Sequence, residues 1–482
     1  MSAGDLAGGR TARLGLYDAA ALARAAEVLE EVERRGLEVV RLSFVDQHGI
    51  LRGKALAAGA LASAFRSGVA MTSTLLLKDT SHRTVFPVWD GGPGIGEGRL
   101  DAAGDMLMLP DPESFRVLPW SPHNGWMLCD LRYADGAEMP FCPRSILKRS
   151  VAGLAADGLR LTCGLEVEFH VHRVEDARLA HADAGMPGAP PETGLLAHGY
   201  QYLTEARYDA LEDAMDAIRR AAQGLGLPVR SMEVEFGPSQ CEMTFDPADP
   251  VSHADAMALF RHATKEVCRR MGLHASFMSR PRLDGVVPSG WHLHQSVSDS
   301  EGRNLFAPER EGLTPTASGW IAGLLARAAE SCMITTPTVN GYKRYQPFML
   351  APDRIQWGRD NKGAMIRALI APGDAASRIE NRVAEPAACP HLVFAAQIAA
   401  GRDGVARDLA APAPVEDPYR SEAARLPADL GAAIDAFEAS ELWPAVWGAD
   451  TVRWLATIKR AEWRRYLAAV SEWEQREYYG LF

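Results

Sequence analysis

The stretch CGLEVEFHVHR, residues 163–173, alternates hydrophobic and ionisable side chains. Its hydrophobic positions are Leu165, Val167, Phe169 and Val171. The ionisable positions between them are Glu166, Glu168, His170 and His172. Because successive side chains of a β-strand point to opposite faces of a sheet, the pattern predicts a strand with its carboxylates and imidazoles on one face.

Three later segments repeat this alternation of ionisable side chains. They are SMEVEFGPSQCEM with Glu233, Glu235 and Glu242, GWHLHQS with His292, His294 and Ser296, and SRIENR with Arg378, Glu380 and Arg382. One pair of acids on a strand is usually only the wet face of a half-buried sheet. Four strands that carry carboxylate, imidazole and guanidinium groups favour a functional site where their faces converge.

Converging carboxylates need a source of positive charge. Two of them about 5 Å apart repel by about 3 kcal/mol at an effective dielectric near 20, and several such pairs rival a folding stability of about 5–15 kcal/mol. Divalent cations would neutralise the cluster. Oxygen ligands with one imidazole and no thiolate suit Mg²⁺ or Mn²⁺. The neighbouring arginines indicate a phosphate or carboxylate substrate, and phosphoryl transfer from a nucleotide fits both features.

Composition limits the class of protein. The 482 residues are 47% hydrophobic and 23% charged, which fits a soluble chain of two or three domains, or one large α/β domain plus a smaller one. A net charge of −11 argues against binding nucleic acid. The chain contains no apolar run of 18 residues, so no membrane span is expected. The seven scattered cysteines form no CxxC pair and fit a reducing cytoplasm, so we expect a cytoplasmic protein.

The periodicity of the chain predicts alternating elements after a short flexible N-terminus at residues 1–16. Helices are expected at about 18–35, 143–157, 205–225, 250–271 and 315–333, and throughout the region after 426. Strands are expected near 38–45, 163–171, 230–236, 273–278, 291–297, 364–370 and 377–383. The proline-containing clusters at 109–120 indicate a join between a small N-terminal domain and a larger one.

Taken in order, the motifs resemble those of the glutamine synthetase family, within the γ-glutamyl ligases. The matching segments are FVDQHGILRGK, DMLMLPDPESFRVLPW, GLEVEF, EFGPSQCE, SGWHLHQS, NGYKRYQPFMLAP, WGRDNKGAMIR, SRIENR and SEWEQREY. The resemblance implies an α+β fold, with a small β-grasp-like domain at 17–120 and a catalytic domain at 121–482 whose curved antiparallel sheet is flanked by helices. It also implies hexameric or dodecameric rings with active sites between subunits.

The same resemblance implies a role for each matching residue. One metal would be held by Glu168, Glu235 and Glu242, and the second, which holds the nucleotide phosphates, by Glu166, His292 and Glu380. ATP would contact His294, Ser296, Arg367 and Arg378. The substrate carboxylate and the transferring phosphoryl group would meet Arg344 and Arg382, with Lys362 also catalytic and Glu168 and Leu350 beside the substrates. Asp46 of a neighbouring subunit would bind and deprotonate the attacking amine. His170, His172 and Glu233 match no role, and we expect them on a solvated strand face.

The chain departs from the family pattern at three places. Leu350 replaces the glutamate that attracts ammonium in ammonia-using members, Lys362 replaces an arginine, and Val287 with Pro288 replaces an asparagine–glycine pair. A leucine can neither accept a proton nor attract a cation, so the amine pocket should be more apolar.

The resemblance implies an ATP-dependent ligase that uses two or three Mg²⁺ or Mn²⁺ ions and activates the γ-carboxylate of glutamate as a γ-glutamyl phosphate. The departures predict that its acceptor is an organic amine, alkyl or aromatic, rather than ammonia. The alternatives are an ordinary glutamate–ammonia ligase and a catalytically retired structural or regulatory homologue. A polyamine acceptor and a guanidino acceptor are less favoured. The sequence does not identify the amine, the exact acid substrate, the ring size or the regulation.

Overall fold

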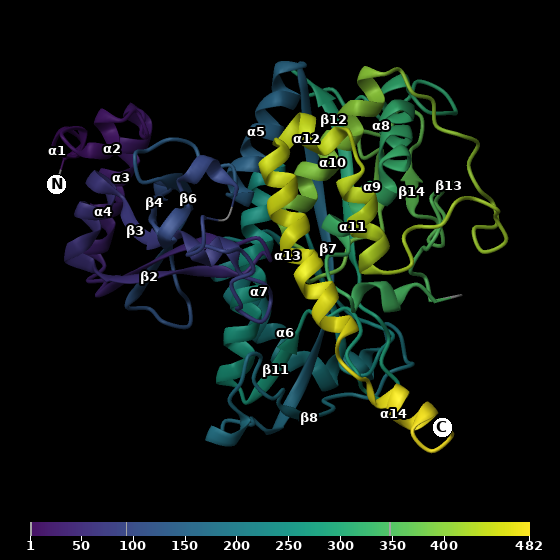
Figure 1. Ribbon diagram of the computed structural model, residues 1–482. Helices are drawn as coiled ribbons and strands as arrows, with labels where there is room; N and C mark the ends of the chain where they lie inside the picture. The colour runs from purple at the N-terminus through teal and green to yellow at the C-terminus, as the bar shows by residue number, and fades with distance from the viewer. Residues whose placement is uncertain (1, 93, 347–348) are drawn as a thin grey trace.

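The computed structural model describes residues 2–92, 94–346 and 349–482, which form two units (Figure 1). The first unit contains helices α1 (Ala3–Ala7), α2 (Arg10–Arg13), α3 (Ala19–Arg34) and α4 (Leu61–Ser67). Its strands are β1 (Val39–Val45), β2 (Leu51–Ala57), β3 (Val69–Thr72), β4 (Asp105–Pro110), β5 (Arg116–Val117) and β6 (Asn124–Tyr133). They form a sheet in the order β2-β1-β6-β4-β3, with β5 beside β6. β1 and β6 run parallel, and the other described pairs are antiparallel.

Local sequence explains how helix α3 and strand β1 pack. The Asp18 carboxylate caps α3 by accepting a hydrogen bond from the Ala21 amide. The buried positions of the helix recur every three or four residues, at Leu22, Ala25, Val28 and Val32. This spacing places them on one side of the helix. In β1 the buried positions alternate instead, at Val40, Leu42 and Phe44.

The structure differs from the expected domain limits at both ends of the first unit. The first residues form the short helices α1 and α2 rather than a flexible tail, because Leu6 and Thr11 are buried and the Thr11 hydroxyl donates to the Phe65 carbonyl at 2.6 Å. The expected boundary at residue 120 comes too early, because β6 pairs with both β1 and β4. The sheet of the first unit therefore continues to Tyr133.

The second unit is built around a larger sheet. Its strands are β7 (Leu159–Asp176), β8 (Glu192–Gly194), β9 (Val229–Val234), β10 (Gln240–Phe245), β11 (Leu273–Ser276), β12 (Trp291–Asp299), β13 (Trp357–Arg359), β14 (Ile366–Leu369) and β15 (Arg378–Asn381). The order is β13-β14-β15-β12-β7-β10-β9, and β8 and β11 also pair with β7. Apart from the parallel β13–β14 pair, the described pairs are antiparallel. The prediction of an antiparallel sheet in an α+β fold is confirmed.

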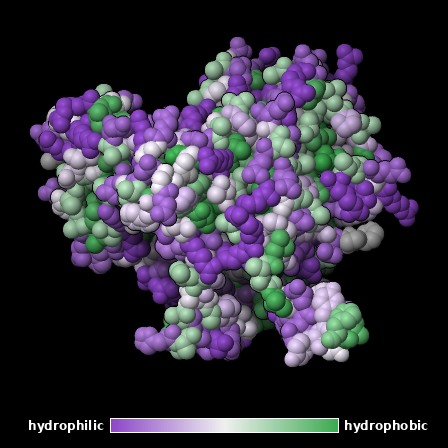
Figure 2. Space-filling model, in the orientation of Figure 1, coloured by the Kyte–Doolittle hydropathy of each residue, from purple (hydrophilic) through white to green (hydrophobic). Residues whose placement is uncertain are grey.

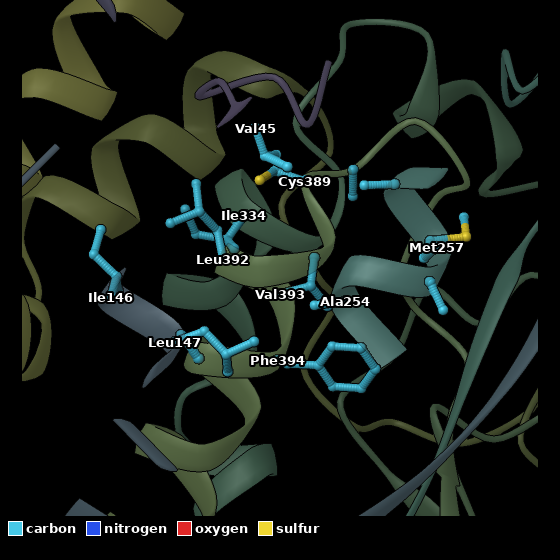
Figure 3. Close-up of a cluster of buried hydrophobic side chains, with 14 of the residues drawn as sticks. Val45, Ile146, Leu147, Ala254, Met257, Ile334, Cys389, Leu392, Val393 and Phe394 are labelled. Atoms are coloured by element: carbon cyan, nitrogen blue, oxygen red, sulfur yellow. The ribbon is translucent and has the colours of Figure 1, made fainter. Parts of the chain in front are cut away.

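Helices pack around this sheet. They are α5 (Pro143–Ala156), α6 (Glu205–Gly224), α7 (Pro250–Arg270), α8 (Pro315–Ala326), α9 (Ala328–Thr335), α10 (Pro390–Ala406), α11 (Leu430–Glu438), α12 (Leu442–Trp447), α13 (Ala449–Leu467) and α14 (Glu472–Tyr478). Every residue of α10 from Pro390 to Gly401 is buried. Figure 3 shows Leu392, Val393 and Phe394 of α10 in one cluster with Ile146 and Leu147 of α5. Helix α10 is therefore the centre of the helical core.

A buried arginine connects the two units. Arg144 on α5 lies 2.7 Å from Asp111, 3.0 Å from Asp130 and 2.7 Å from Asp255. The first two aspartates belong to the first unit and Asp255 to α7, so the guanidinium joins three segments. The three carboxylates offset the cost of burying its charge.

The outer surface carries mixed side chains. Figure 2 shows hydrophilic and hydrophobic residues interspersed over the visible face, with a hydrophobic group at the C-terminal end. Within the described ranges, no helix is long and apolar enough to cross a membrane.

Candidate active site

Strand register brings the predicted acidic residues together. Glu168 of β7 lies directly opposite Glu242 of β10, and Glu166 lies opposite His292 of β12. On the next strand pair, His294 faces Glu380 of β15. Residues directly opposite on neighbouring strands have their Cβ atoms roughly 5 Å apart, so the predicted convergence follows from pairing alone.

Two groups of side chains in this cluster could each hold a metal ion. The first is Glu166, His292 and Glu380, and the second is Glu168, Glu242 and His292. Within each group the potential ligand atoms all lie within 4.8 Å of one another. Glu235 lies outside both groups, and its carboxylate accepts a hydrogen bond from the Phe236 amide at 3.0 Å. It nevertheless lines the same cavity as the other glutamates.

Burial gives one part of the cluster a strong need for positive charge. Burial, together with the charges of the neighbouring carboxylates, raises the pKa of Glu168 to about 8 and of Glu242 to about 11. The pKa of Glu235 is also raised, first by burial and then by the charges of Glu166 and Glu233. Without cations Glu168 and Glu242 would hold protons at neutral pH. Oxygen ligands in this state fit a site for hard divalent ions, which displace the protons.

The other part of the cluster already has hydrogen-bonding partners. Burial alone would raise the pKa of Glu166, but His292 and His294 hold it well below its usual range. His292 Nδ1 lies 2.5 Å from Glu166, and His294 Nε2 lies 3.1 Å from it. Burial, followed by the Arg382 cation, lowers the pKa of His292 itself. A neutral imidazole is the form that can bind a metal ion.

Arginines surround Glu380, which is fully buried. Arg367 donates to its carboxylate at 3.1 Å, and Arg382 donates to its other oxygen. Arg344 is buried and donates to the Val383 and Ala384 carbonyls, both at 3.0 Å. The Nε groups of Arg344 and Arg382 are buried without a hydrogen-bond partner in the described structure. Both arginines therefore keep a donor for an anionic ligand.

Two cavities meet at this cluster. The first, of about 450 Å³, is lined by Glu166, Glu168, Glu235, Glu242, His292, Arg344, Leu350, Lys362, Arg367 and Arg382, among others. The second, of about 570 Å³, is lined by all four residues predicted to contact ATP, which are His294, Ser296, Arg367 and Arg378. Glu166, Glu233, Thr244 and Arg367 line both cavities. A ligand that crosses this shared wall could place its phosphates beside the acidic cluster.

Asp46 is separate from these cavities within one chain. It does not line either cavity in the described part of the chain, and its side chain is fully buried. Its carboxylate accepts hydrogen bonds from the His48 and Ile50 amides, both at 2.9 Å, and from Arg52 at 2.5 Å. The structure thus shows Asp46 closing the turn between β1 and β2, and its role as a base stays a prediction that requires a second subunit.

One wall of the first cavity is apolar, and most of it was not found from the sequence. Tyr202 and Phe236 stack with their ring centroids 5.4 Å apart, and both line the cavity. Leu350 is 47% exposed and Phe236 is 45% exposed. Other apolar residues of this wall are Tyr200, Val286, Val287, Pro288, Met349 and Ala351. Leu350 was predicted here from the sequence, whereas nothing in the segment HGYQYL at 198–203 distinguished its tyrosines from surface residues.

The prediction of a solvated face was wrong for His170 and His172. Both imidazoles are buried and stack on each other with ring centroids 5.8 Å apart. Strand β11 pairs with this end of β7 and places His274 opposite His172. Burial lowers the pKa of His170 to about 3 and of His172 to about 4, so both are neutral. Glu233 lines both cavities, and its carboxylate accepts from the Ser231 hydroxyl at 3.1 Å.

The α+β fold, the paired carboxylate groups and the surrounding arginines define a metal-dependent enzyme that acts on phosphate and carboxylate groups. More specifically, the chain belongs to the glutamine synthetase family. The glutamine synthetase catalytic domain matches residues 140–478. The predicted resemblance is thereby confirmed, and the match begins just after β6.

Similar proteins extend over almost the whole chain. It is 41% identical to the γ-glutamylanilide synthase of an Acinetobacter species, over 94% of this chain and 95% of that protein. It is 31% identical to the γ-glutamylethanolamide synthetase GlnA4 of Streptomyces coelicolor, over 97% and 96% of the two chains. Among solved structures, ligand-free GmaS superposes with a TM-score of 0.79 at 30% identity, over 94% of this chain and 99% of that one.

Proposed function

We propose that this protein is an ATP-dependent ligase that forms a γ-glutamyl amide from glutamate and an organic amine, through a γ-glutamyl phosphate. The observation that carries the proposal is the composition of the first cavity. One side is lined by five of the six predicted metal ligands, with the buried Glu380 beside Glu166 and His292, and the other side carries Leu350 and a stacked aromatic pair. The relatives named γ-glutamylanilide synthase and γ-glutamylethanolamide synthetase support an organic acceptor.

The acidic side would serve the activation of glutamate. Two or three Mg²⁺ or Mn²⁺ ions, held by Glu166, Glu168, Glu235, Glu242, His292 and Glu380, would neutralise phosphate charge when bound. Arg344 and Arg382 would orient the substrate carboxylate and stabilise charge on the transferring phosphoryl group with their unpaired Nε donors. His294, Ser296, Arg367 and Arg378 would hold ATP in the second cavity. Lys362 would add a cation at the first cavity, without the bidentate grip of an arginine.

The apolar side would bind the acceptor. A carboxylate here would attract ammonium, whereas Leu350 and Phe236 offer contact area to an alkyl or aromatic group. The amine must be neutral when it attacks, because a protonated nitrogen has no lone pair. Asp46 from a neighbouring subunit would take the proton that is released, which requires it to give up part of its own hydrogen bonding.

We further propose that the chain works as a hexameric or dodecameric ring, with each active site between two subunits. Helix α14 supports self-association, because it projects from the body of the molecule (Figure 1). Trp473, Tyr479, Leu481 and Phe482 in this region are all more than half exposed. Exposed apolar clusters of this kind mark interaction surfaces. The seven cysteines are free and buried, which fits the proposed cytoplasmic location.

An acceptor screen tests the proposal. The protein would be incubated with glutamate, ATP and Mg²⁺ or Mn²⁺ against a panel of ammonia, small alkylamines, arylamines and polyamines, with ADP release and the mass of the amide product measured. We expect an alkyl- or arylamine to be the best acceptor. A Glu166→Gln variant should release no ADP, which controls for contaminating activity. Ammonia as the best acceptor by far would overturn the proposal in favour of an ordinary glutamate–ammonia ligase.

The retired-homologue alternative has its own test. A ligase should bind Mg²⁺ and ATP and melt at a higher temperature in their presence, because a ligand that binds only the folded state stabilises it. An unchanged melting temperature at saturating ATP would favour a structural or regulatory protein.

A further inference from the structure

A third cavity lies between the two units and is separate from the proposed active site. Its volume is about 540 Å³, and none of its lining residues lines either cavity at the acidic cluster. The first unit contributes residues 47–51 and Thr80. The second unit contributes parts of α7, α9, α10 and α13 and the segment 276–279. The cavity thus adjoins the turn that is closed by Asp46.

The walls of this cavity are largely apolar, but its charged groups are all basic. Its large apolar side chains are Phe277, Met278, Met333, Ile334, Leu392 and Leu455. Arg261, Lys265 and Lys459 also line it, and no aspartate or glutamate does so in the described ranges. An apolar cavity with only positive charge favours an apolar ligand that carries an anionic group.

The three cations differ in how much of their hydrogen bonding is already used. Arg261 is buried and donates to the carbonyl oxygens of Gly49 at 2.6 Å and of Pro386 at 2.9 Å. Lys459 pairs with Glu462 at 3.0 Å. Lys265 is exposed at the cavity and has no ion-pair or hydrogen-bond partner among the described residues. It is therefore the cation that is free to bind a carboxylate.

Two residues that line this cavity each have a buried acceptor atom without a partner in the described structure. Gln47 uses its amide nitrogen to donate to the Lys78 carbonyl at 2.6 Å, which leaves its Oε1 unpaired. His48 Nε2 lies 3.0 Å from the same carbonyl. A carbonyl only accepts, so this nitrogen carries the proton. Burial lowers the pKa of His48 and keeps the ring neutral, so the unpaired Nδ1 is an acceptor.

Both side chains are more than nine-tenths buried, at 4% exposure for Gln47 and 8% for His48. Buried acceptors without a donor cost free energy, which an N–H group on a ligand would recover. An ammonium group is a poor candidate for that donor, because Arg261 and Lys265 would repel it. A neutral N–H group can donate to these acceptors without being repelled by the cations.

We infer that this cavity binds a small carboxylate with an apolar body and a neutral N–H donor, as in an N-acylated aromatic amino acid. Its carboxylate would pair with Lys265, its N–H would donate to Gln47 or His48, and its apolar part would contact Phe277 and the α10 side of the cavity. The inference is independent of the proposed ligase reaction. Occupancy would hold the 46–50 turn, which links this cavity to the position of Asp46.

Calorimetric titration of the full-length protein with N-acetyl-L-phenylalanine tests the inference. We expect one binding site per chain. N-acetyl-L-phenylalaninamide lacks the carboxylate, and 3-phenylpropionate lacks the N–H, so each should bind about tenfold more weakly. Hydrogen exchange at residues 46–51 should slow on binding. Undetectable binding, or displacement of the probe by glutamate with ATP, would overturn the inference.

Three variants locate the site. Lys265→Gln should weaken binding of N-acetyl-L-phenylalanine about tenfold, since it removes the one unpaired cation. Thr80→Trp, at an exposed lining position, should block the cavity without disturbing the core. Lys54→Gln is the matched control, because Lys54 is exposed and bonded to the Ala70 carbonyl outside the cavity. Equal binding by Lys265→Gln, Thr80→Trp and the control would place the probe elsewhere and refute the inference.

Discussion

The two sides of the first cavity are built in opposite ways. On the acidic side Glu242 is only 5% exposed, and its neighbours are other carboxylates and a histidine. On the apolar side Phe236 and Leu350 are each nearly half exposed. Buried charge without a counter-ion opposes folding, and exposed apolar surface adds nothing to the core. Each side therefore lacks a partner that a ligand could supply, cations on one side and an apolar amine on the other.

The comparison also indicates which side can vary among related enzymes. The acidic side depends on several strands in register, so a change at one ligand affects the whole group. The apolar side consists of loop residues and exposed side chains, which can change without altering the sheet. We expect acceptor preference to be set on the apolar side and the activation of glutamate on the acidic side.

The largest effect should come from disabling the acidic side. Glu242→Gln should reduce ligase activity on the order of 1000-fold, because the second metal group loses a charged ligand. Its melting temperature without metal should stay close to that of the unchanged protein, since burial already keeps Glu242 protonated and glutamine resembles that form. The stabilisation by Mn²⁺ should be lost. Thermal melts with and without Mn²⁺, together with ADP release, measure all three.

Glu233→Gln is the matched control for that variant. Glu233 lines the same cavity and stands opposite Glu242 on β9, but it belongs to neither metal group. It should keep most of the activity and the stabilisation by Mn²⁺. Equal losses in the two variants would mean that the cavity holds charge diffusely rather than in defined metal sites.

Introducing a carboxylate on the apolar side should shift the acceptor preference toward ammonia. Leu350→Glu should shift the ratio of kcat/KM for ammonia over the preferred organic amine on the order of 10- to 100-fold toward ammonia. The added charge would attract ammonium and provide a proton acceptor beside it. Leu350→Met keeps the size without the charge and should leave the ratio unchanged. If this ratio is unchanged in Leu350→Glu, Leu350 does not determine which acceptor is used.

Ionisable groups outside the first cavity should affect the pH dependence of folding stability rather than activity. His172 lies on the same strand as Glu168 but is buried, and it lies beside His170 and His274. Its pKa is about 4 in the fold against an ordinary 6.5, so between these values only the unfolded chain takes up the proton. Stability should therefore fall as pH drops from 7 toward 4, by roughly 1–2 kcal/mol at pH 5 after allowing for solvent screening.

The variant His172→Gln removes this proton uptake. Its loss of stability between pH 7 and pH 5, measured by urea unfolding, should be smaller than that of the unchanged protein by that amount. Arg173→Gln, at the next and exposed position of β7, should leave the acid sensitivity unchanged. If His172→Gln loses stability as steeply as the unchanged protein, the imidazole is already charged in the fold.

Much of the acidic side could be predicted from the sequence, because alternation fixes which side chains share a strand face. The pairing of Glu168 with Glu242 and of Glu166 with His292 confirmed that those faces converge. Alternation does not show what covers a face. His170 and His172 were therefore expected in solvent, although both are buried.

Long-range pairing and loop positions were harder to predict. The sequence gives no sign that β6 inserts between β1 and β4, so the first unit extends further than expected. Tyr202 and Phe236 come from two separate loop segments, and nothing local indicates that their rings stack over the same cavity. Glu235 was predicted as a metal ligand and lines the cavity outside both metal groups, so its role stays a prediction.

The smallest effect should come from weakening the aromatic pair. Tyr202→Leu removes the stacking on Phe236 and should raise KM for an arylamine acceptor about 3- to 10-fold, in line with the strength of aromatic contacts. The rate with a small alkylamine such as methylamine should hardly change, because methylamine is too small to cover the rings. Steady-state kinetics with both acceptors make the comparison within one variant. Equal losses with both would assign Tyr202 to binding glutamate or ATP, and acceptor choice would then depend on Leu350 and its neighbours alone.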